Sequence, residues 1–299
     1  MKKQNLAYVL FTAVGFAAME PASKLLTDQI NPLALTFFRF LIGSIMLLPM
    51  AVHALRRRRL TLTLRDLVGL AVRGILCVCV SMGLLQVAVF RARSAAMVAV
   101  VFCTNSVMTV LFAAWLLNER LTRRRVLALA LCMAGVAAGG GGAADENVSA
   151  ILLALAAAAA MSLFTVLGKR ELHRIPTSVQ IGVSFSIGTA VLGVLLLLTG
   201  TPLTARGLDA GGVGILLFLG IVVTGLGYLS YFKAMEQAGA FMASLVFFIK
   251  PVLAPLMSLL ILGQAKGGAA LVASILLVMA GSTMMLTEGR THKRREGAV

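Results

Sequence analysis

Residues 94–119 read SAAMVAVVFCTNSVMTVLFAAWLLNE, and residues 239–264 read GAFMASLVFFIKPVLAPLMSLLILGQ. The two segments align without gaps, and seven of the 26 aligned positions are identical. Farther along, CMAG at 132–135 corresponds to VMAG at 278–281 after one inserted residue. This pattern indicates an internal repeat in which the two segments hold equivalent positions of two halves.

The composition places the chain in a membrane. Of its 299 residues 60% are hydrophobic and 13% are charged, and the mean hydropathy is +0.97. Soluble domains carry about 25% charged residues. The net charge of +16 would favour nucleic acid in a soluble protein, but here it lies in short clusters between apolar runs. We therefore expect an all-α integral membrane protein whose basic loops contact anionic lipid headgroups, with no nucleic-acid partner.

Hydropathy predicts ten transmembrane helices. The apolar run that begins at Leu6 continues to about Leu26, so we interpret it as a retained first helix rather than a signal peptide. Each run has the length of about 20 residues that a bilayer core requires. The expected spans are 6–26, 33–51, 66–88, 95–117, 124–142, 148–168, 178–199, 211–232, 240–262 and 268–286.

The loop charges predict the orientation of these spans. With the N-terminus inside, 19 Lys and Arg residues fall in inner segments and five in outer ones. Positive residues concentrate on the cytoplasmic side of membrane proteins. We expect a multi-pass protein of the bacterial inner membrane with both termini cytoplasmic.

Five helices in each half force the second half to enter the membrane upside down. We expect one repeat at 1–145 and the other at 146–299, the second with a basic cytoplasmic tail. The basic segment ERLTRRR at 119–125 has the counterpart QAKGGAA at 264–270, which is nearly free of positive charge. Inverted repeats are typical of transporters that bind their substrate near the bilayer midplane.

Three features resemble one family. They are LLNERLTRRRVLALALCMAGV at 116–136, RFLIGSIMLLP at 39–49 and the Pro-containing helix at 240–262. They are similar to EamA-type transporters of the drug/metabolite transporter superfamily, and the resemblance covers the whole chain as two units. It implies export of amino acids, drugs or other metabolites, or uptake in some members. The chain departs from the family at Gly263–Gln264, where a Gly–Glu pair is common.

Lys250 stands near the centre of the span at 240–262, within FFIKPVLAP. A charge there costs about 2.5–3.5 kcal/mol on insertion scales and therefore tends to face the protein interior. Pro251 and Pro255 leave backbone carbonyls without their helical donors. The repeat pairs Lys250 with Asn105, and we expect these positions to approach each other centrally. We interpret Lys250 as lining a cavity, against the alternative of a structural lysine bonded to carbonyls or a buried acid.

A second polar group lies in AMEPASK. Glu20 and Lys24 share one helical face, and Pro21 between them invites a kink. Glu20 is either a coupling or substrate-amine site or part of a local ion pair with Lys24, which we expect to snorkel. Arg39 could pair with Glu20 or hold an anionic substrate group bidentately.

Other polar residues in the spans complete the candidate site. Gln86, Asn105, Tyr228 and Tyr231 could add hydrogen bonds, and each alone is equally explained as a satisfied interior group. Arg73 lies near the predicted cytoplasmic end of its span, and we expect it to snorkel. We expect no metal site, no cofactor and no catalytic set.

These observations favour a secondary transporter that works by alternating access and moves small carboxylate-bearing solutes such as amino acids outward. The alternatives are a flippase for a lipid-linked substrate, an intramembrane enzyme or a structural subunit; the missing catalytic set disfavours an enzyme. Coupling to protons or another ion stays open, as does the choice between monomer and homodimer.

Overall fold

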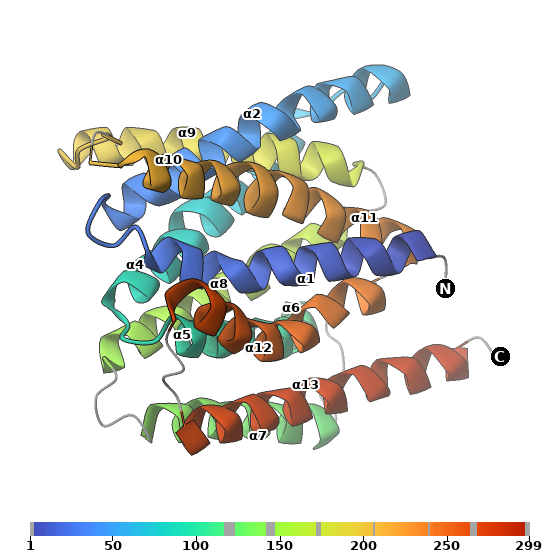
Figure 1. Cartoon of the computed structure of the whole chain (residues 1–299). Coiled ribbons are helices and arrows are strands. Elements are labelled where there is room, and N and C mark those ends of the chain that lie inside the picture. Colours follow the sequence, from blue (N-terminus) through green and yellow to red (C-terminus); the bar gives the residue numbers. More distant parts are fainter. Residues whose placement is uncertain are drawn as a thin grey trace.

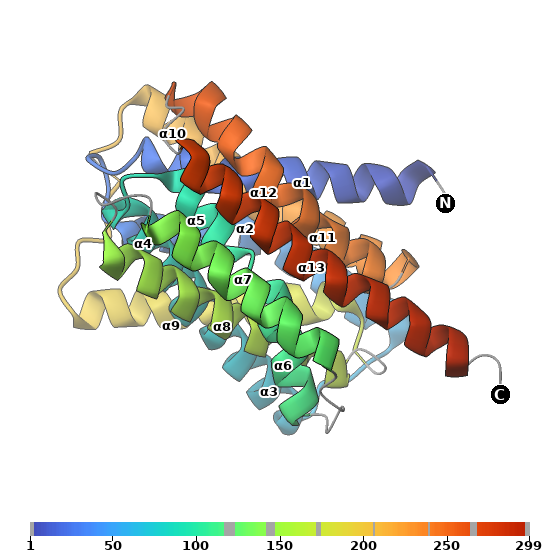
Figure 2. The same ribbon diagram turned by 90° about the horizontal axis from the view of Figure 1, so that it is seen from below.

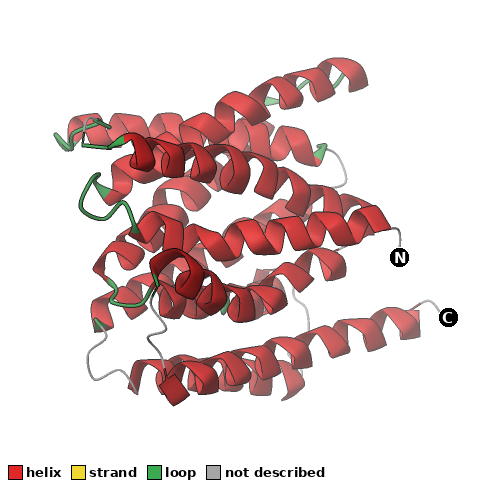
Figure 3. Ribbon diagram, in the orientation of Figure 1, coloured by secondary structure: helices red, strands yellow, loops and turns green. Residues whose placement is uncertain are grey.

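The structure is a computed structural model, and it describes residues 3–116, 123–141, 147–171, 175–205, 207–238, 240–263 and 268–296. Within these ranges all regular structure is helical, and turns and short loops join the helices (Figure 3). The expected all-α architecture is confirmed for this part of the chain.

The helical elements include two π-helices, η1 and η2, each placed between two α-helices. In chain order the elements are α1 (Lys3–Lys24), α2 (Pro32–Arg58), α3 (Leu64–Gly74), η1 (Ile75–Met82), α4 (Gly83–Arg91), α5 (Ala95–Phe102), α6 (Asn105–Leu116), α7 (Arg123–Gly141), α8 (Val148–Glu171), α9 (Thr177–Leu198), α10 (Ala210–Leu217), η2 (Phe218–Gly227), α11 (Tyr228–Ala238), α12 (Ala240–Leu262) and α13 (Gly268–Glu296).

Seven helical segments of the described chain are long and apolar enough to cross a membrane. They are Leu6–Lys24, Pro32–Arg58, Leu64–Arg91, Ala95–Leu116, Val148–Gly168, Thr177–Leu198 and Ala210–Ala234. The other three predicted spans correspond to α7, α12 and α13, which contain shorter apolar stretches at Val126–Gly135, Ile249–Leu262 and Leu271–Gly281. The chain is a multi-pass membrane protein with seven candidate spans in its described part, and the total of ten stays a prediction.

Two differences between the predicted spans and the structure have a clear local cause. The span at 95–117 is divided, because α5 ends at Phe102 and α6 begins at Asn105 after a turn. The span at 66–88 begins earlier, at Leu64, because Thr63 and Asp66 form a capping box. Hydropathy detects neither feature, because caps and breaks depend on hydrogen bonds rather than on apolar content.

The two π-helices occupy equivalent places in the predicted repeat. The aligned segments lie 145 positions apart, so Ile75–Met82 corresponds to residues 220–227, which fall within η2. In both places an α-helix, the π-helix and a second α-helix follow one another without a break: α3, η1 and α4 in the first half, and α10, η2 and α11 in the second. Because π-helices are rare and often occur at functional sites, their recurrence supports the equivalence of the two segments.

The helices pack in a bundle in which distant parts of the chain lie side by side. The blue α1 packs along the orange α12, and α2 packs along α9 (Figure 1). The pair α7 and α13 lies together in both views, at the edge of the bundle in Figure 1 (Figures 1 and 2). The N-terminal end of α1 and the C-terminal end of α13 lie at the same end of the bundle (Figures 1 and 2), and the cytoplasmic placement of both termini stays a prediction.

Backbones meet where α3 and η1 cross α9. A Cβ atom on Gly74 would lie 2.0 Å from the carbonyl oxygen of Ser184, and one on Gly188 would lie 2.4 Å from the carbonyl oxygen of Gly74. Small residues at such crossings let membrane helices approach closely and gain van der Waals contact. This crossing fixes the position of α3 and η1 beside the centre of the bundle.

Candidate functional site

Glu20 of α1 and Lys250 of α12 form an ion pair inside the bundle. Nζ of Lys250 donates to Oε1 of Glu20 at 2.6 Å, and the two side chains are 1% and 0% exposed, respectively. The other carboxylate oxygen of Glu20, Oε2, is buried without a hydrogen-bond partner. The pair therefore holds one unsatisfied acceptor in an apolar interior.

The pair exists because neither charge can be buried alone at low cost. Removing one partner of a buried pair costs about 3–5 kcal/mol, since the other charge is then uncompensated. For Lys250, one of the two alternatives from the sequence was a bond to a buried acid. The structure contains that bond, and the acid is Glu20. This contact also joins α1 of the first predicted half to α12 of the second.

Lys24 has a different role from the one we expected. Its Nζ donates to the carbonyl oxygens of Val89, Phe90 and Ala92, at 3.1, 3.0 and 2.5 Å. Carbonyl groups at the end of a helix lack helical donors, and a cation there is favourable. The expected pairing of Glu20 with Lys24 is therefore corrected, because Glu20 pairs with Lys250 and Lys24 anchors α1 to the end of α4; the snorkelling of Lys24 stays a prediction.

The three predicted helix-break prolines lie inside helices. Pro21 is within α1, and Pro251 and Pro255 are within α12. Each proline lacks the N–H that would donate to the carbonyl four residues earlier. Pro21 thus leaves the carbonyl of Ala17 without its helical donor, and Pro251 does the same for Phe247. Both helices continue through their prolines, so Glu20 and Lys250 are held next to positions of weakened backbone hydrogen bonding.

Arg39 of α2 is a second buried cation close to the ion pair. It is 1% exposed, and its guanidinium carbon lies 5.0 Å from the centre of the Phe40 ring. Its Nε and Nη1 atoms are buried without hydrogen-bond partners, and it interacts electrostatically with Glu20 and Tyr228. Buried unsatisfied donors are costly, and Arg39 carries two of them.

Asn105 and Gln86 are buried at 3% exposure each. Asn105 begins α6, its carbonyl oxygen accepts from Ser162 Oγ at 2.7 Å, and its side-chain Nδ2 has no partner. Gln86 lies in α4, and its Nε2 likewise has no partner. The ammonium group of Lys250 lies 5.2 Å from the ring centre of Phe102, one turn before Asn105. The approach of Lys250 to Asn105 itself stays a prediction.

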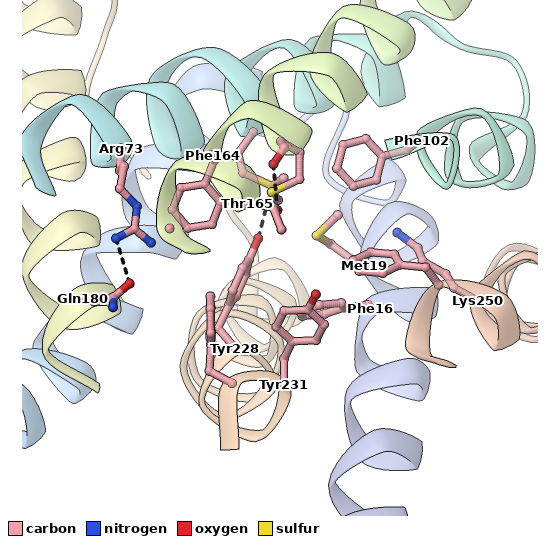
Figure 4. Close-up of a pocket in the computed structure, with 15 residues that line it drawn as sticks. Phe16, Met19, Arg73, Phe102, Phe164, Thr165, Gln180, Tyr228, Tyr231 and Lys250 are labelled. Carbon is pink, nitrogen blue, oxygen red and sulfur yellow. Dashed lines mark hydrogen bonds between the residues drawn. The ribbon is translucent and has the colours of Figure 1, made fainter. Parts of the chain in front are cut away.

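A cavity of about 40 Å³ lies at the centre of these helices. Phenylalanine, tyrosine and methionine side chains form most of its wall, with Lys250 on one side and Arg73 with Gln180 on the other (Figure 4). Tyr228 and Tyr231, both predicted site residues, also line it. The other predicted residues do not line the cavity. Glu20 contacts Lys250, which does line it, whereas Arg39, Asn105 and Gln86 lie outside the lining.

Two more polar residues line the cavity: Arg73, a sequence candidate for which we favoured snorkelling, and Gln180, which the sequence analysis did not identify. Arg73 is only 3% exposed, and its Nη1 donates to Oε1 of Gln180 at 2.8 Å. Gln180 in turn donates to the carbonyl oxygen of Ile175 at 2.9 Å, which fixes its amide. The expectation that Arg73 snorkels is wrong, because α8 and α9 cover it. The signal for Gln180 was a long amide in an otherwise apolar span.

Two sequence features lie outside the described residues: the departure at Gln264 and the predicted boundary between the halves at 145–146. Among the residues that the structure describes, no group of three His, Cys, Asp or Glu side chains could hold a metal ion.

Comparisons with known proteins agree with this geometry. Residues 5–138 and 148–287 each match the EamA-like transporter family. An "Uncharacterized transporter" of Clostridium kluyveri is 35% identical over 272 residues, which cover 88% of this chain and 87% of the relative. A solved structure, described as "Crystal structure of protein", has a TM-score of 0.64 at 24% identity and covers 94% of this chain and 98% of its own. That likeness shows the fold.

The helical bundle, its apolar spans and these matches define a multi-pass membrane transporter. The chain belongs to the EamA-like transporter family, with two matching segments that together cover most of its length.

Proposed function

We propose that this protein is a secondary transporter that exports small carboxylate-bearing solutes, amino acids in particular, across the bacterial inner membrane by alternating access. The observation that carries the proposal is the buried ion pair between Glu20 and Lys250, whose lysine lines the central cavity. Ionisable residues inside a membrane bundle are costly and are commonly part of a substrate or ion pathway.

The ion pair matches the charges of a zwitterionic solute. A substrate carboxylate can replace Glu20 as the partner of Lys250, and Arg39 has two unpartnered nitrogens that could bind the same group. The released carboxylate of Glu20 then accepts the substrate ammonium or a proton. Lys250 and Glu20 each keep a partner throughout, so substrate binding avoids the cost of separating this pair.

The small central cavity fits an occluded conformation. Ligand cavities usually measure about 300–1,000 Å³, whereas this one has about 40 Å³. A solute the size of an amino acid enters only when the helices around the cavity separate. We infer ten spans in two inverted halves, 1–145 and 146–299, whose relative rocking opens the cavity to each side in turn.

A flux assay in proteoliposomes tests the proposal. Purified protein is screened with a panel of amino acids, other carboxylates and uncharged solutes, with and without a proton gradient. We expect flux of at least one carboxylate-bearing solute and loss of that flux in Lys250→Ala, while Lys250→Ala stays folded in the membrane. Arg57→Gln removes a cation from the exposed end of α2 and serves as the matched control, with flux as in the parent. Parent-like flux in Lys250→Ala would overturn the site assignment.

A further inference from the structure

A second cavity, larger than the central one, lies between α2, α9 and α11. Its volume is about 460 Å³, which is within the usual range for ligand sites. Residues of its wall include Pro49, His53, Thr177, Ile181, Phe232 and Lys233. A small solute therefore fits here in the conformation in which the central cavity is closed to it.

This second cavity lies at the basic end of the bundle. His53 is three residues before Arg56, where the basic cluster Arg56–Arg59 begins, and it is exposed. Lys233 is half-buried, and its ammonium group lies 5.8 Å from the ring centre of Tyr8. The positive charge predicts that this end faces the cytoplasm, and it attracts solutes with a negative group.

Phe232 is the structural link between the two cavities, because its side chain lines both of them. The residue is 8% exposed, and its ring lies edge-on to Tyr231, with ring centres 5.2 Å apart. Tyr231 belongs to the central cavity, and Lys233 belongs to the second one. Three consecutive residues of α11 thus pass from one cavity, across their shared wall, to the other.

We propose that the second cavity is the vestibule through which an anionic or carboxylate-bearing solute reaches the central cavity from the basic end, and that Phe232 is the partition residue between them. This inference rests on the proposed transport function. It adds a second solute site, with Lys233 as its cationic group and the exposed imidazole of His53 beside it, and a residue that controls passage from that site.

The backbone of this region allows the partition to move. α11 follows directly after η2, in which the regular α-helical hydrogen bonding is interrupted. Such interruptions are positions where helices bend. A change in the angle between η2 and α11 moves Phe232 relative to α2 and α9 and joins the two cavities.

Cysteine labelling tests the partition without a substrate. The reporter is Thr165→Cys, a central-cavity position on α8, in a background whose four cysteines are replaced by serine or alanine. A membrane-impermeant maleimide is added to inverted vesicles, so that it arrives at the basic end. We expect the labelling rate to rise about tenfold in Phe232→Ala, because a small side chain favours the joined state. The rate falls below the parent in Phe232→Trp.

The matched control is Phe247→Ala, which removes the same ring from the central cavity but not from the vestibule. Labelling of the reporter from the basic end then stays at the parent rate. If Phe232→Ala does not fold, Phe232→Leu gives a smaller rise. An unchanged rate in the Phe232 variants, or an equal rise in Phe247→Ala, overturns the proposal. A third outcome separates the two proposals. If the labelling rate depends on the side chain at position 232 but the protein transports none of the tested solutes, the partition is supported and the proposed transport function is rejected.

Discussion

Nζ of Lys250 lies 2.6 Å from Oε1 of Glu20, although 230 residues separate the two positions in the chain. The contact holds α1 against α12 and gives Lys250, which lines the central cavity, a buried carboxylate as its partner. The ion pair therefore both stabilises the packing of two helices and supplies charged groups that could bind a solute. Mutations can separate its effect on stability from its effect on transport.

Neutralising either member of the ion pair should destabilise the protein more than neutralising both. Glu20→Met or Lys250→Met leaves one buried charge without its partner and lowers the free energy of unfolding by about 3–5 kcal/mol. The double variant Glu20→Met with Lys250→Met removes both charges, and we expect stability close to that of the parent but no flux. Thermal unfolding in detergent and proteoliposome flux measure the two effects. A double variant that transports normally would show that the pair is only structural.

Arg39→Met should stabilise the protein and weaken transport. The guanidinium has two buried nitrogens without partners, and each buried unsatisfied donor costs about 1–3 kcal/mol. Methionine fills similar space without the charge, so we expect a higher midpoint of thermal unfolding. Because Arg39 is proposed to bind the substrate carboxylate, the KM for transport should rise by about tenfold or more. A lower midpoint with an unchanged KM would contradict both parts.

Gly74→Ala should prevent normal folding, whereas Gly15→Ala should be tolerated. A Cβ on Gly74 would lie 2.0 Å from the backbone oxygen of Ser184, and backbone cannot move aside as a side chain can. A Cβ on Gly15, also in a helix, would meet no atom within 4 Å. The yield of monodisperse protein after membrane extraction measures the effect. Equal yields for the two variants would show that α3 and α9 do not cross as closely as described.

The inverted repeat predicts opposite sides of the membrane for equivalent positions. Arg124 and Ala269 are 145 residues apart, are both exposed, and correspond in the repeat. Single cysteines at these positions should be labelled from opposite faces by an impermeant thiol reagent, with Arg124→Cys reached from the cytoplasm. Labelling of both positions from one face would exclude the inverted arrangement.

The all-α, multi-pass character of the chain could be predicted because it depends on local composition. A bilayer selects apolar runs of a fixed length, and loop charge responds to membrane side. The break before Asn105 and the π-helices could not be predicted in this way, because they change backbone hydrogen bonds without changing hydropathy.

The candidate site was predicted in part. The sequence by itself determined that Lys250 would face the protein interior, since a charge in an apolar span avoids lipid, and it singled out Glu20 and Arg39 as candidates. Only the tertiary structure decided that Glu20 pairs with Lys250 rather than Lys24, that Arg73 lies under α8 and α9, and that Phe232 borders two cavities. Burial follows from the cost of a single charge in an apolar medium. Partners depend instead on how distant helices are rotated and packed against one another.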